Sequence, residues 1–250
     1  MSLEDVQHES GASGRFRSSA ATHVGTVRSL NQDGFVHRPE LGLWAVADGA
    51  GGHEAGEAAS GLIVDALRAL PTDLPPSDLL LEVQARLGSV HDTLREASEQ
   101  RGPGAVIAST VVVLLAHEDH FACLWAGDSR GYLWHAGGLL QITHDHSLVQ
   151  DLLDAGEITE EAAERHPHAN IVTRALGAEL DAFSLDKQLG VLVPGDRLML
   201  CSDGLTKVVS DVEIAGLLGG EAPLDAQALV MAALERGARD NVTAVVVEVE

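Results

Sequence analysis

The sequence has little positive charge. It contains 16 Lys and Arg residues against 38 Asp and Glu residues, which gives a formal net charge of −22. A surface this acidic repels phosphate backbones and anionic lipid headgroups at long range. We therefore expect neither nucleic acids nor membranes as partners.

Cysteines and long apolar runs are also scarce. The two cysteines, Cys123 and Cys201, each lie inside an apolar run that is typical of a core strand. Two separated buried thiols form no disulfide framework and favour a reducing compartment, so we expect a cytoplasmic protein. No run approaches the roughly 18 apolar residues of a membrane span, and the polar N-terminus lacks the apolar segment of a secretory signal. We therefore expect no membrane anchor.

The length and apolar content suit one substantial core. The chain has 250 residues, of which 45% are hydrophobic, and a single domain of this size is ordinary. The first residues are polar and resemble a mobile lead-in. We expect a flexible N-terminal segment over residues 1–17 and one domain over residues 18–250.

The order of the predicted elements argues against a parallel sheet. A strand is expected over Ala21–Val27, and helices are expected over Glu54–Leu70 and Ser77–Gln100, where apolar residues recur at helical spacing. Short strands follow, then a polar flap near residues 144–176, more strands, a helical pair over Asp211–Gly237 and a closing strand. Because strands and helices do not alternate, we predict an α+β fold, an α-β-β-α sandwich with two central antiparallel sheets flanked by helices.

Three apolar strands end in an aspartate that a small residue follows. They are "LWAVADG", "CLWAGDS" and "LMLCSDG", which end at Asp48, Asp128 and Asp203. Asp33 in "NQDGF" follows the first strand, and Asp240 in "RDNVTAVVV" precedes the last. A single Asp-Gly pair is more often a simple turn, but five such aspartates can meet at one edge of a sheet pair.

Clustered carboxylates repel one another unless cations separate them. A site with only oxygen ligands selects Mg²⁺ or Mn²⁺ over Zn²⁺, which prefers Cys and His. Bound cations of this kind activate a water for attack on phosphorus. The pattern therefore favours a metal-dependent phosphate hydrolase.

Six stretches of the chain, in order, resemble the bacterial branch of the metal-dependent protein phosphatase 2C family. They are "VRSLNQDGF", "WAVADGAGGHEAGEAAS", "AGDSRGYLWHAGGLLQITHDHSLVQDLLDAGEIT", "HPHANIVTRALG", "CSDGLT" and "ARDNVTAVVV". The resemblance implies a protein serine/threonine phosphatase that uses two or three Mn²⁺ or Mg²⁺ ions. It implies hydrolysis of phosphoserine and phosphothreonine by a metal-bridging water or hydroxide, in opposition to a cognate Ser/Thr kinase.

The resemblance also assigns the central metal ligands. Asp48 would bridge two metals, and the Gly49 carbonyl would bind one of them. Asp33, Asp203 and Asp240 would complete the set. The same aspartates follow from the strand-end pattern without the resemblance.

Further residues receive roles with less direct support. Arg28 would bind the substrate phosphate, because a guanidinium fork matches two phosphate oxygens, so Arg28 and Asp48 are the expected catalytic residues. Asp128 would bind a third metal, although a turn aspartate is the alternative, and Asn170 would assist from the flap. Arg130 is expected to be structural and to pair with nearby acids.

The histidines do not identify the general acid. Ala50 stands where eukaryotic relatives carry a histidine, so the chain departs from that pattern, and His53 is as well explained as a cap at a helix start. His144, His146, His166 and His168 of the flap are better explained as solvent-facing residues than as a zinc site.

Other functions remain open at this stage. The sequence around Cys201 lacks the Cys-x5-Arg spacing of a cysteine phosphatase. A non-catalytic regulatory module on the same fold and a different metal hydrolase, such as a phosphodiesterase, are the alternatives. We also hypothesise that an acidic site would favour basic or flexible phosphopeptides.

Overall fold

A computed structural model describes residues 6–51, 55–178, 183–220 and 225–250. The elements in chain order are β1 (Gln7–Ser13), β2 (Phe16–His23), β3 (Asp33–Arg38), the 3₁₀ turn η2 (Pro39–Leu41), β4 (Leu43–Ala50), α1 (Ala55–Arg68), α2 (Pro76–Arg101), β5 (Ala108–Ser109), β6 (Val111–His117), β7 (His120–Ala126), β8 (Arg130–His135), β9 (Gly138–Gln141), α3 (Leu148–Asp154), α4 (Glu160–Glu164), β10 (Asp186–Val191), β11 (Arg197–Cys201), α5 (Asp203–Thr206), α6 (Asp211–Leu218), α7 (Ala226–Glu235) and β12 (Val242–Val249).

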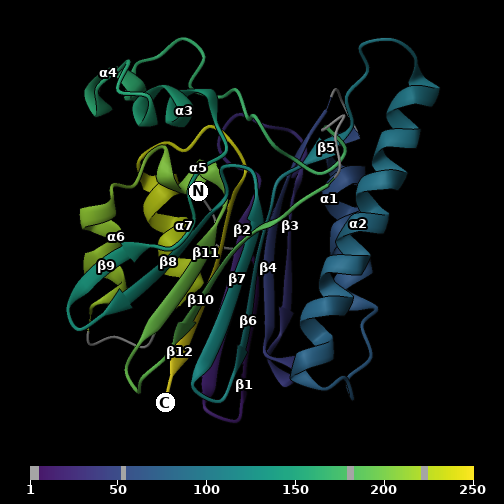
Figure 1. The fold of residues 1–250 in the computed structure, drawn as a ribbon. Helices are drawn as coiled ribbons and strands as arrows, with labels where there is room; N and C mark the ends of the chain where they lie inside the picture. The colour runs from purple at the N-terminus through teal and green to yellow at the C-terminus, as the bar shows by residue number, and fades with distance from the viewer. Residues whose placement is uncertain (1–5, 52–54, 179–182, 221–224) are drawn as a thin grey trace.

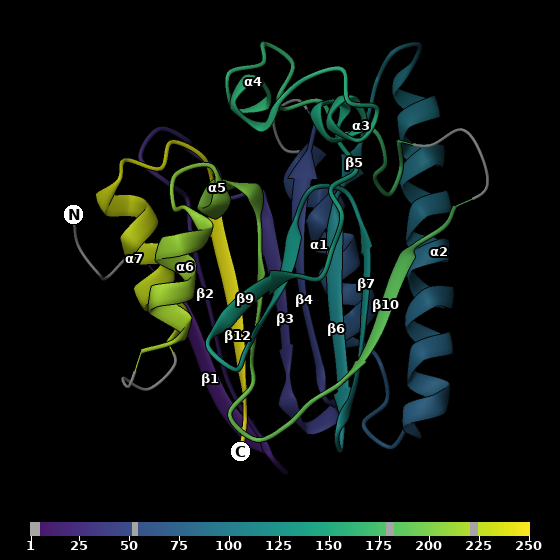
Figure 2. The ribbon, with the colours of Figure 1, turned by 60° about the vertical axis from the view of Figure 1, so that its left-hand side comes forward.

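The strands form two antiparallel sheets that pack face to face. One sheet has the order β1-β2-β12-β11-β8-β9, and the other has the order β10-β7-β6-β4-β3, with β5 paired to β4. Helices α1 and α2 lie on the outer side of the second sheet, and α6 and α7 lie on the outer side of the first (Figures 1 and 2). The predicted α-β-β-α sandwich is confirmed.

Three apolar clusters correspond to the three interfaces between these layers. Trp44 and Val112 from one sheet meet Leu200 and Val245 from the other in the central cluster. The second cluster joins the β4 sheet to α1 and α2, and the third joins the β12 sheet to α5, α6 and α7. Burial on both faces explains why the central strands are continuous apolar runs.

Helix α2 shows how the sequence sets a boundary. Pro76 lies at the first helical turn, where the missing N–H would have no intrahelical acceptor. Its buried side chains include Val83, Leu87, Val90 and Leu94, which recur at spacings of three and four residues. The predicted helix over Ser77–Gln100 is confirmed, with one more residue at each end. The start expected for the preceding helix, Glu54, lies outside the described residues, and α1 is seen from Ala55.

The N-terminal region differs from the prediction. The strand expected over Ala21–Val27 is instead β2, which ends at His23, because the chain turns at Gly25. There φ is +81°, and a Cβ would lie 2.0 Å from the Asp240 carbonyl oxygen, so only glycine allows this approach. Residues 7–13, expected within a flexible lead-in, form strand β1 against β2. The domain boundary at residue 18 remains a prediction.

The flap contains two short helices, α3 and α4. Ser147 and Thr159 cap α3 and α4 by accepting the backbone N–H groups of Gln150 and Ala162. Both helices lie above one end of the two sheets (Figures 1 and 2). Among the described residues, no helix combines the length and the apolar character that crossing a bilayer requires.

Candidate active site

The five predicted aspartates meet at the edge of the sandwich below the flap. Asp33 begins β3 and is paired in register with Asp48 near the end of β4. Asp128 lies in the turn between β7 and β8, Asp203 follows β11 as the first residue of α5, and Asp240 precedes β12. The antiparallel order of both sheets therefore brings together carboxylates that are far apart in the sequence.

Asp33 links the two sheets directly. Its Oδ2 accepts hydrogen bonds from Ser202 Oγ and Thr243 Oγ1, each at 2.7 Å, and both donors belong to the opposite sheet region. Its Oδ1 is buried and has no hydrogen-bond partner within the described part of the chain. A buried carboxylate oxygen without a partner is costly, so this oxygen is available to a ligand.

The strand end at Asp48 is held closely against the start of α1. A Cβ on Gly49 would lie 1.9 Å from the Gly56 carbonyl oxygen, and a Cβ on Gly56 would lie 2.6 Å from that of Gly49. Glycine is therefore required at both positions. Thr110 fixes the strand from the other side, because its N–H donates to the Asp48 carbonyl at 2.9 Å. This close approach explains the glycine-rich turn after the strand.

Burial and mutual repulsion change how these carboxylates ionise. Burial raises the pKa of Asp33 to about 7, although two hydroxyl hydrogen bonds oppose the change. Burial, followed by the charge of Asp33, raises the pKa of Asp48 well above its usual range. Burial and the charge of Asp203 raise the pKa of Asp128 to about 7. Such shifts mark carboxylates that lack a compensating cation among the described residues.

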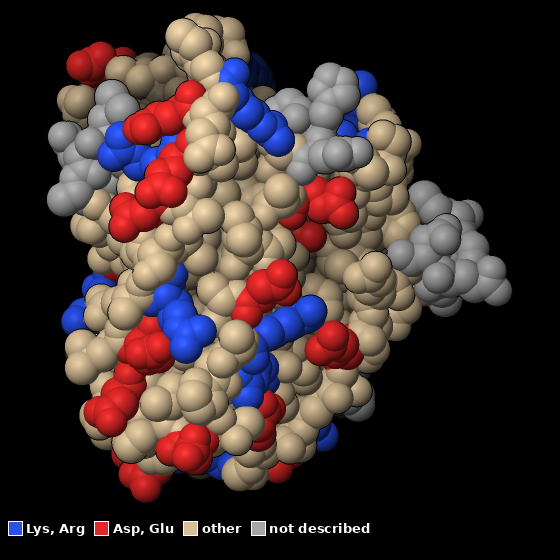
Figure 3. Space-filling model, turned by 90° about the vertical axis from the view of Figure 1, so that its right-hand side faces the viewer, with Lys and Arg blue, Asp and Glu red and all other residues tan. Residues whose placement is uncertain are grey.

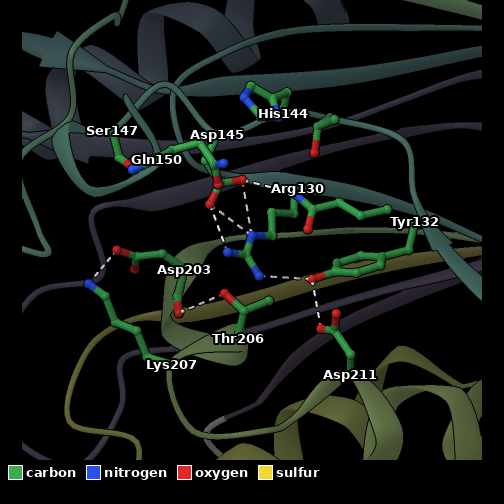
Figure 4. Close-up of polar contacts among 12 residues, drawn as sticks. Arg130, Tyr132, His144, Asp145, Ser147, Gln150, Asp203, Thr206, Lys207 and Asp211 are labelled. Carbon is green, nitrogen blue, oxygen red and sulfur yellow. Dashed lines mark hydrogen bonds and ion pairs between the residues drawn. The ribbon is translucent and has the colours of Figure 1, made fainter. Parts of the chain in front are cut away.

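The other two carboxylates are paired with cations. Arg28 donates from Nε to Asp240 Oδ1 at 2.8 Å and from Nη2 to Oδ2 at 3.0 Å. Burial opposes ionisation of Asp240, but these hydrogen bonds outweigh it and lower its pKa. Lys207 forms an ion pair with Asp203 four residues before it (Figure 4). The structure therefore places Arg28 at the aspartate cluster.

The donor chemistry of this cluster fits hard divalent cations. All candidate side-chain ligands are carboxylates, one buried oxygen has no partner, and the Gly49 carbonyl belongs to the same strand end. Within the described residues, no three Asp, Glu, His or Cys side chains already form a closed metal-binding group. Asp203 and Asp240 are instead turned to Lys207 and Arg28.

A cavity of about 540 Å³ adjoins the cluster. It lies between the turn after β2, the flap, α5 and the segment before β12, and Arg28, Asn170, Lys207, Arg239 and Asp240 contribute to its lining. The structure thus brings the flap residue Asn170 to the same cavity as the predicted phosphate-binding arginine.

Sequence reasoning missed Lys207 and Arg239. The spacing between Asp203 and Lys207 could have indicated the first, because side chains four residues apart meet on a helix. Arg239 directly precedes Asp240 in "ARDNV", but adjacency to a ligand candidate does not predict that a side chain lines the same cavity.

Arg130 is structural, as predicted. Its guanidinium donates to both carboxylate oxygens of Asp145, with Nη2 to Oδ2 at 2.8 Å, and its Nη1 donates to Tyr132 Oη at 3.1 Å (Figure 4). Asp145 is 8% exposed. This ion pair stabilises the link between β8 and the start of the flap.

The flap histidines have separate surroundings, and His53 lies outside the described residues. His144 pairs with Asp154 at 2.6 Å. His146 is buried, which differs from the expected solvent exposure, because Trp125 stacks on it and its Nδ1 accepts the Gly127 N–H at 3.1 Å. The rings of His166 and His168 lie 5.7 Å apart.

The sequence and the fold both match known proteins. A family model described as protein phosphatase 2C matches residues 23–234. The chain is 38% identical over 235 residues to the serine/threonine protein phosphatase PstP of Mycobacterium tuberculosis, a match that covers 93% of this chain and 45% of that protein. The chain therefore spans about half the length of this relative.

Two solved structures are similar throughout. PppA of Pseudomonas aeruginosa, described as a key regulatory component of the T6SS, has a TM-score of 0.86 and 40% identity, covering 95% of this chain and 99% of that one. The catalytic domain of a PstP in complex with two manganese ions has a TM-score of 0.82 and 37% identity, covering 94% and 98%. An antiparallel sandwich with aspartates at one edge defines the class, and the chain belongs to the protein phosphatase 2C family.

Proposed function

We propose that the chain is a metal-dependent protein phosphatase that hydrolyses phosphoserine and phosphothreonine. The observation that carries this proposal is the meeting of five aspartates from both sheets beside a cavity lined by Arg28. Membership of the phosphatase 2C family and the two manganese ions of the PstP domain support it.

In this proposal, Asp48 and the Gly49 carbonyl, with Asp33, Asp203 and Asp240, hold two Mn²⁺ or Mg²⁺ ions. When bound, these cations supply an activated water and neutralise negative charge on the phosphoryl oxygens. The ligands themselves are pre-positioned, because Asp33 and Asp48 lie on paired strands.

Other residues act around this centre. Arg28 orients the phosphate through its guanidinium fork, which now holds both oxygens of Asp240. Asp128 is the proposed ligand of a third ion, and Asn170 approaches the substrate from the flap, since it lines the cavity that Arg28 lines.

The biological setting is also a proposal. The substrates would be phosphoproteins, and a cognate Ser/Thr kinase would supply them. Two buried free cysteines, Cys123 and Cys201, support a cytoplasmic location.

The test is hydrolysis of a phosphothreonine peptide with and without Mn²⁺, in the wild type and in Asp203→Asn. We expect metal-dependent phosphate release that Asp203→Asn lowers by at least about 100-fold, since loss of one preorganised electrostatic group costs about 10²–10³ in rate. Asp65→Asn is the matched control, because it removes one negative charge from an exposed position on α1.

Each outcome separates the alternatives. A folded wild type that releases no phosphate with any divalent metal would contradict the proposal and favour the regulatory module. Activity against phosphodiesters but not against the peptide would favour the other metal hydrolase. Equal activity in Asp203→Asn and Asp65→Asn would remove Asp203 from the site.

A further inference from the structure

The cavity beside the aspartate cluster has a local charge opposite to that of the whole chain. Three cationic side chains, Arg28, Lys207 and Arg239, line it together with one carboxylate, Asp240. The chain as a whole has a net charge of −22 and 16 basic residues. Three of the few cations therefore share one cavity of about 540 Å³.

The face that carries α2 shows a different arrangement. Lys and Arg side chains there lie beside Asp and Glu side chains and form no cationic patch (Figure 3). Along α2, Arg86 pairs with Glu82 at 2.8 Å and Arg95 pairs with Glu99 at 3.4 Å. Two of the three arginines of that helix thus each pair with a glutamate on the same helix, whereas the cavity brings three cations together with one carboxylate.

The three cations of the cavity differ in their partners. Arg28 is held by Asp240, and Lys207 is held by Asp203. Arg239 is exposed and has no hydrogen bond or ion pair within the described part of the chain. It is therefore available to an incoming anion, and it lies next in the chain to Asp240.

We propose that Arg239, with Lys207 of the same cavity, binds an anionic group of the substrate that flanks the phosphorylated residue. The inference rests on the proposed function and names its substrate class, namely acidic phosphopeptides. The flanking group is a carboxylate or a second phosphate, because a guanidinium fork matches the paired oxygens of both. Acidic phosphopeptides replace the basic ones that the sequence led us to expect, because the side chains that line the cavity beside the aspartate cluster are mainly cationic.

The test compares peptides that contain a non-hydrolysable phosphonate in place of the phosphothreonine phosphate. One peptide has Asp residues around it, one has Gln at the same positions, and one has the non-hydrolysable phosphonate analogue of phosphoserine there. Fluorescence anisotropy in the presence of Mn²⁺ measures binding to the wild type and to Arg239→Gln. Arg101→Gln is the matched control, because Arg101 is an exposed arginine that does not line the cavity.

We expect the wild type to bind the Asp peptide or the phosphoserine-analogue peptide at least about threefold more tightly than the Gln peptide. Partly exposed charge pairs contribute an affinity difference of this size. Arg239→Gln should lose this preference, Arg101→Gln should keep it, and 0.5 M salt, at a Debye length of about 4 Å, should weaken it. If only the phosphoserine-analogue peptide binds more tightly than the Gln peptide, the flanking group is a phosphate. If the Asp peptide binds more tightly than the Gln peptide, the flanking group is a carboxylate.

Three results would overturn the inference. The wild type would show no preference, Arg239→Gln would keep the full preference, or Arg239→Gln would lose hydrolysis of p-nitrophenyl phosphate, which has no flanking group. The proposed function is tested separately, by hydrolysis. If the wild type hydrolysed no phosphopeptide but still bound acidic peptides more tightly through Arg239, the proposed activity would be wrong and the anionic subsite would still be supported.

Discussion

Two acidic regions at the flap end of the molecule differ in how their charge is compensated. In the first, Arg130 donates three hydrogen bonds to Asp145, with distances from 2.8 to 3.0 Å. Gln141 Nε2 donates to the same carboxylate at 3.0 Å, and the Tyr132 hydroxyl donates a hydrogen bond to Asp211 Oδ1 at 3.1 Å. Each charge in this network has a partner supplied by the chain (Figure 4).

The aspartate cluster lacks this compensation at its centre. Asp128 is buried, Asp33 and Asp48 are half-buried, and desolvation raises the pKa values of all three. Among the described residues, cationic partners are found for the outer members alone, Asp203 and Asp240. The same residue type is thus neutralised by a described side chain in one place and not in the other. This contrast is the physical basis of the proposed metal centre.

The largest effect should come from breaking the compensated region. Arg130→Gln leaves Asp145 buried without its cation, and removal of one partner of a buried ion pair costs about 3–5 kcal/mol. We expect the free energy of unfolding in urea to fall by about 3 kcal/mol. The matched control is Arg86→Gln, whose partner Glu82 has a side chain that is 39% exposed, so it should cost at most about 0.5 kcal/mol. Equal costs for the two variants would show that the Arg130 network is no more stabilising than a surface pair.

The sequence predicted the layered fold and the meeting of the aspartates because both follow from strand patterns. Apolar strands that end in Asp48, Asp128 and Asp203 are visible locally, and antiparallel pairing then brings their ends together. Strand β1 could not be predicted in this way. Its residues, "QHESGAS", are polar and mostly exposed, so they carry no burial pattern, and the hairpin depends on backbone pairing after the turn at Gly14, where φ is +58°.

The partners of individual charged side chains were harder to predict. Arg28 and Asp240 are 212 residues apart, and no local pattern sets the direction in which either side chain points. The burial of His146 depends on Trp125, which stacks on it from β7. Such contacts are decided by tertiary packing, which a single sequence does not encode in its periodicity.

The next effect concerns the aspartate cluster and the pH dependence of its stability, measured in the presence of a chelator that removes divalent metals. The pKa of Asp128 is about 7 in the folded chain and 3.8 in its reference state, so the folded state binds more protons between these values. The stability that this proton provides is complete below about pH 4 and is lost as pH rises to about 7. We expect the free energy of unfolding to fall by a few kcal/mol across this window, since one unit of pKa difference corresponds to about 1.4 kcal/mol.

Asp128→Asn isolates this contribution, because an amide does not titrate. The variant should show a shallower loss of stability between about pH 4 and pH 7 than the wild type, as linkage requires, in urea titrations at several pH values. Identical slopes in the two proteins would mean that Asp128 ionises in the folded chain as easily as in the unfolded one. The aspartate cluster would then be no less compensated than the Arg130–Asp145 network, and the proposed difference between the two regions would be wrong.

The smallest expected effect belongs to a residue that joins the flap to the turn of Asp128. His146 is 8% exposed, its ring Nδ1 accepts the Gly127 N–H at 3.1 Å, and its backbone N–H donates to the Gly127 carbonyl at 3.0 Å. Its Nε2 lies 3.3 Å from Asp186 Oδ2. Like Arg130, it satisfies buried polar groups from within the chain, but its contacts involve a neutral ring.

His146→Ala should leave the Gly127 N–H without an acceptor, which costs about 1–3 kcal/mol, and we expect a loss near 1 kcal/mol in urea unfolding because the backbone bond to the Gly127 carbonyl survives. His144→Ala is the control in the same flap, since His144 is exposed and contacts Asp154 at the surface, and surface substitutions stay within about 0.5 kcal/mol. If both variants unfolded alike, the imidazole of His146 would not fix the turn that holds Asp128. That turn would then depend on Gly127 itself, whose φ of +117° and contact with Thr110 exclude a larger residue.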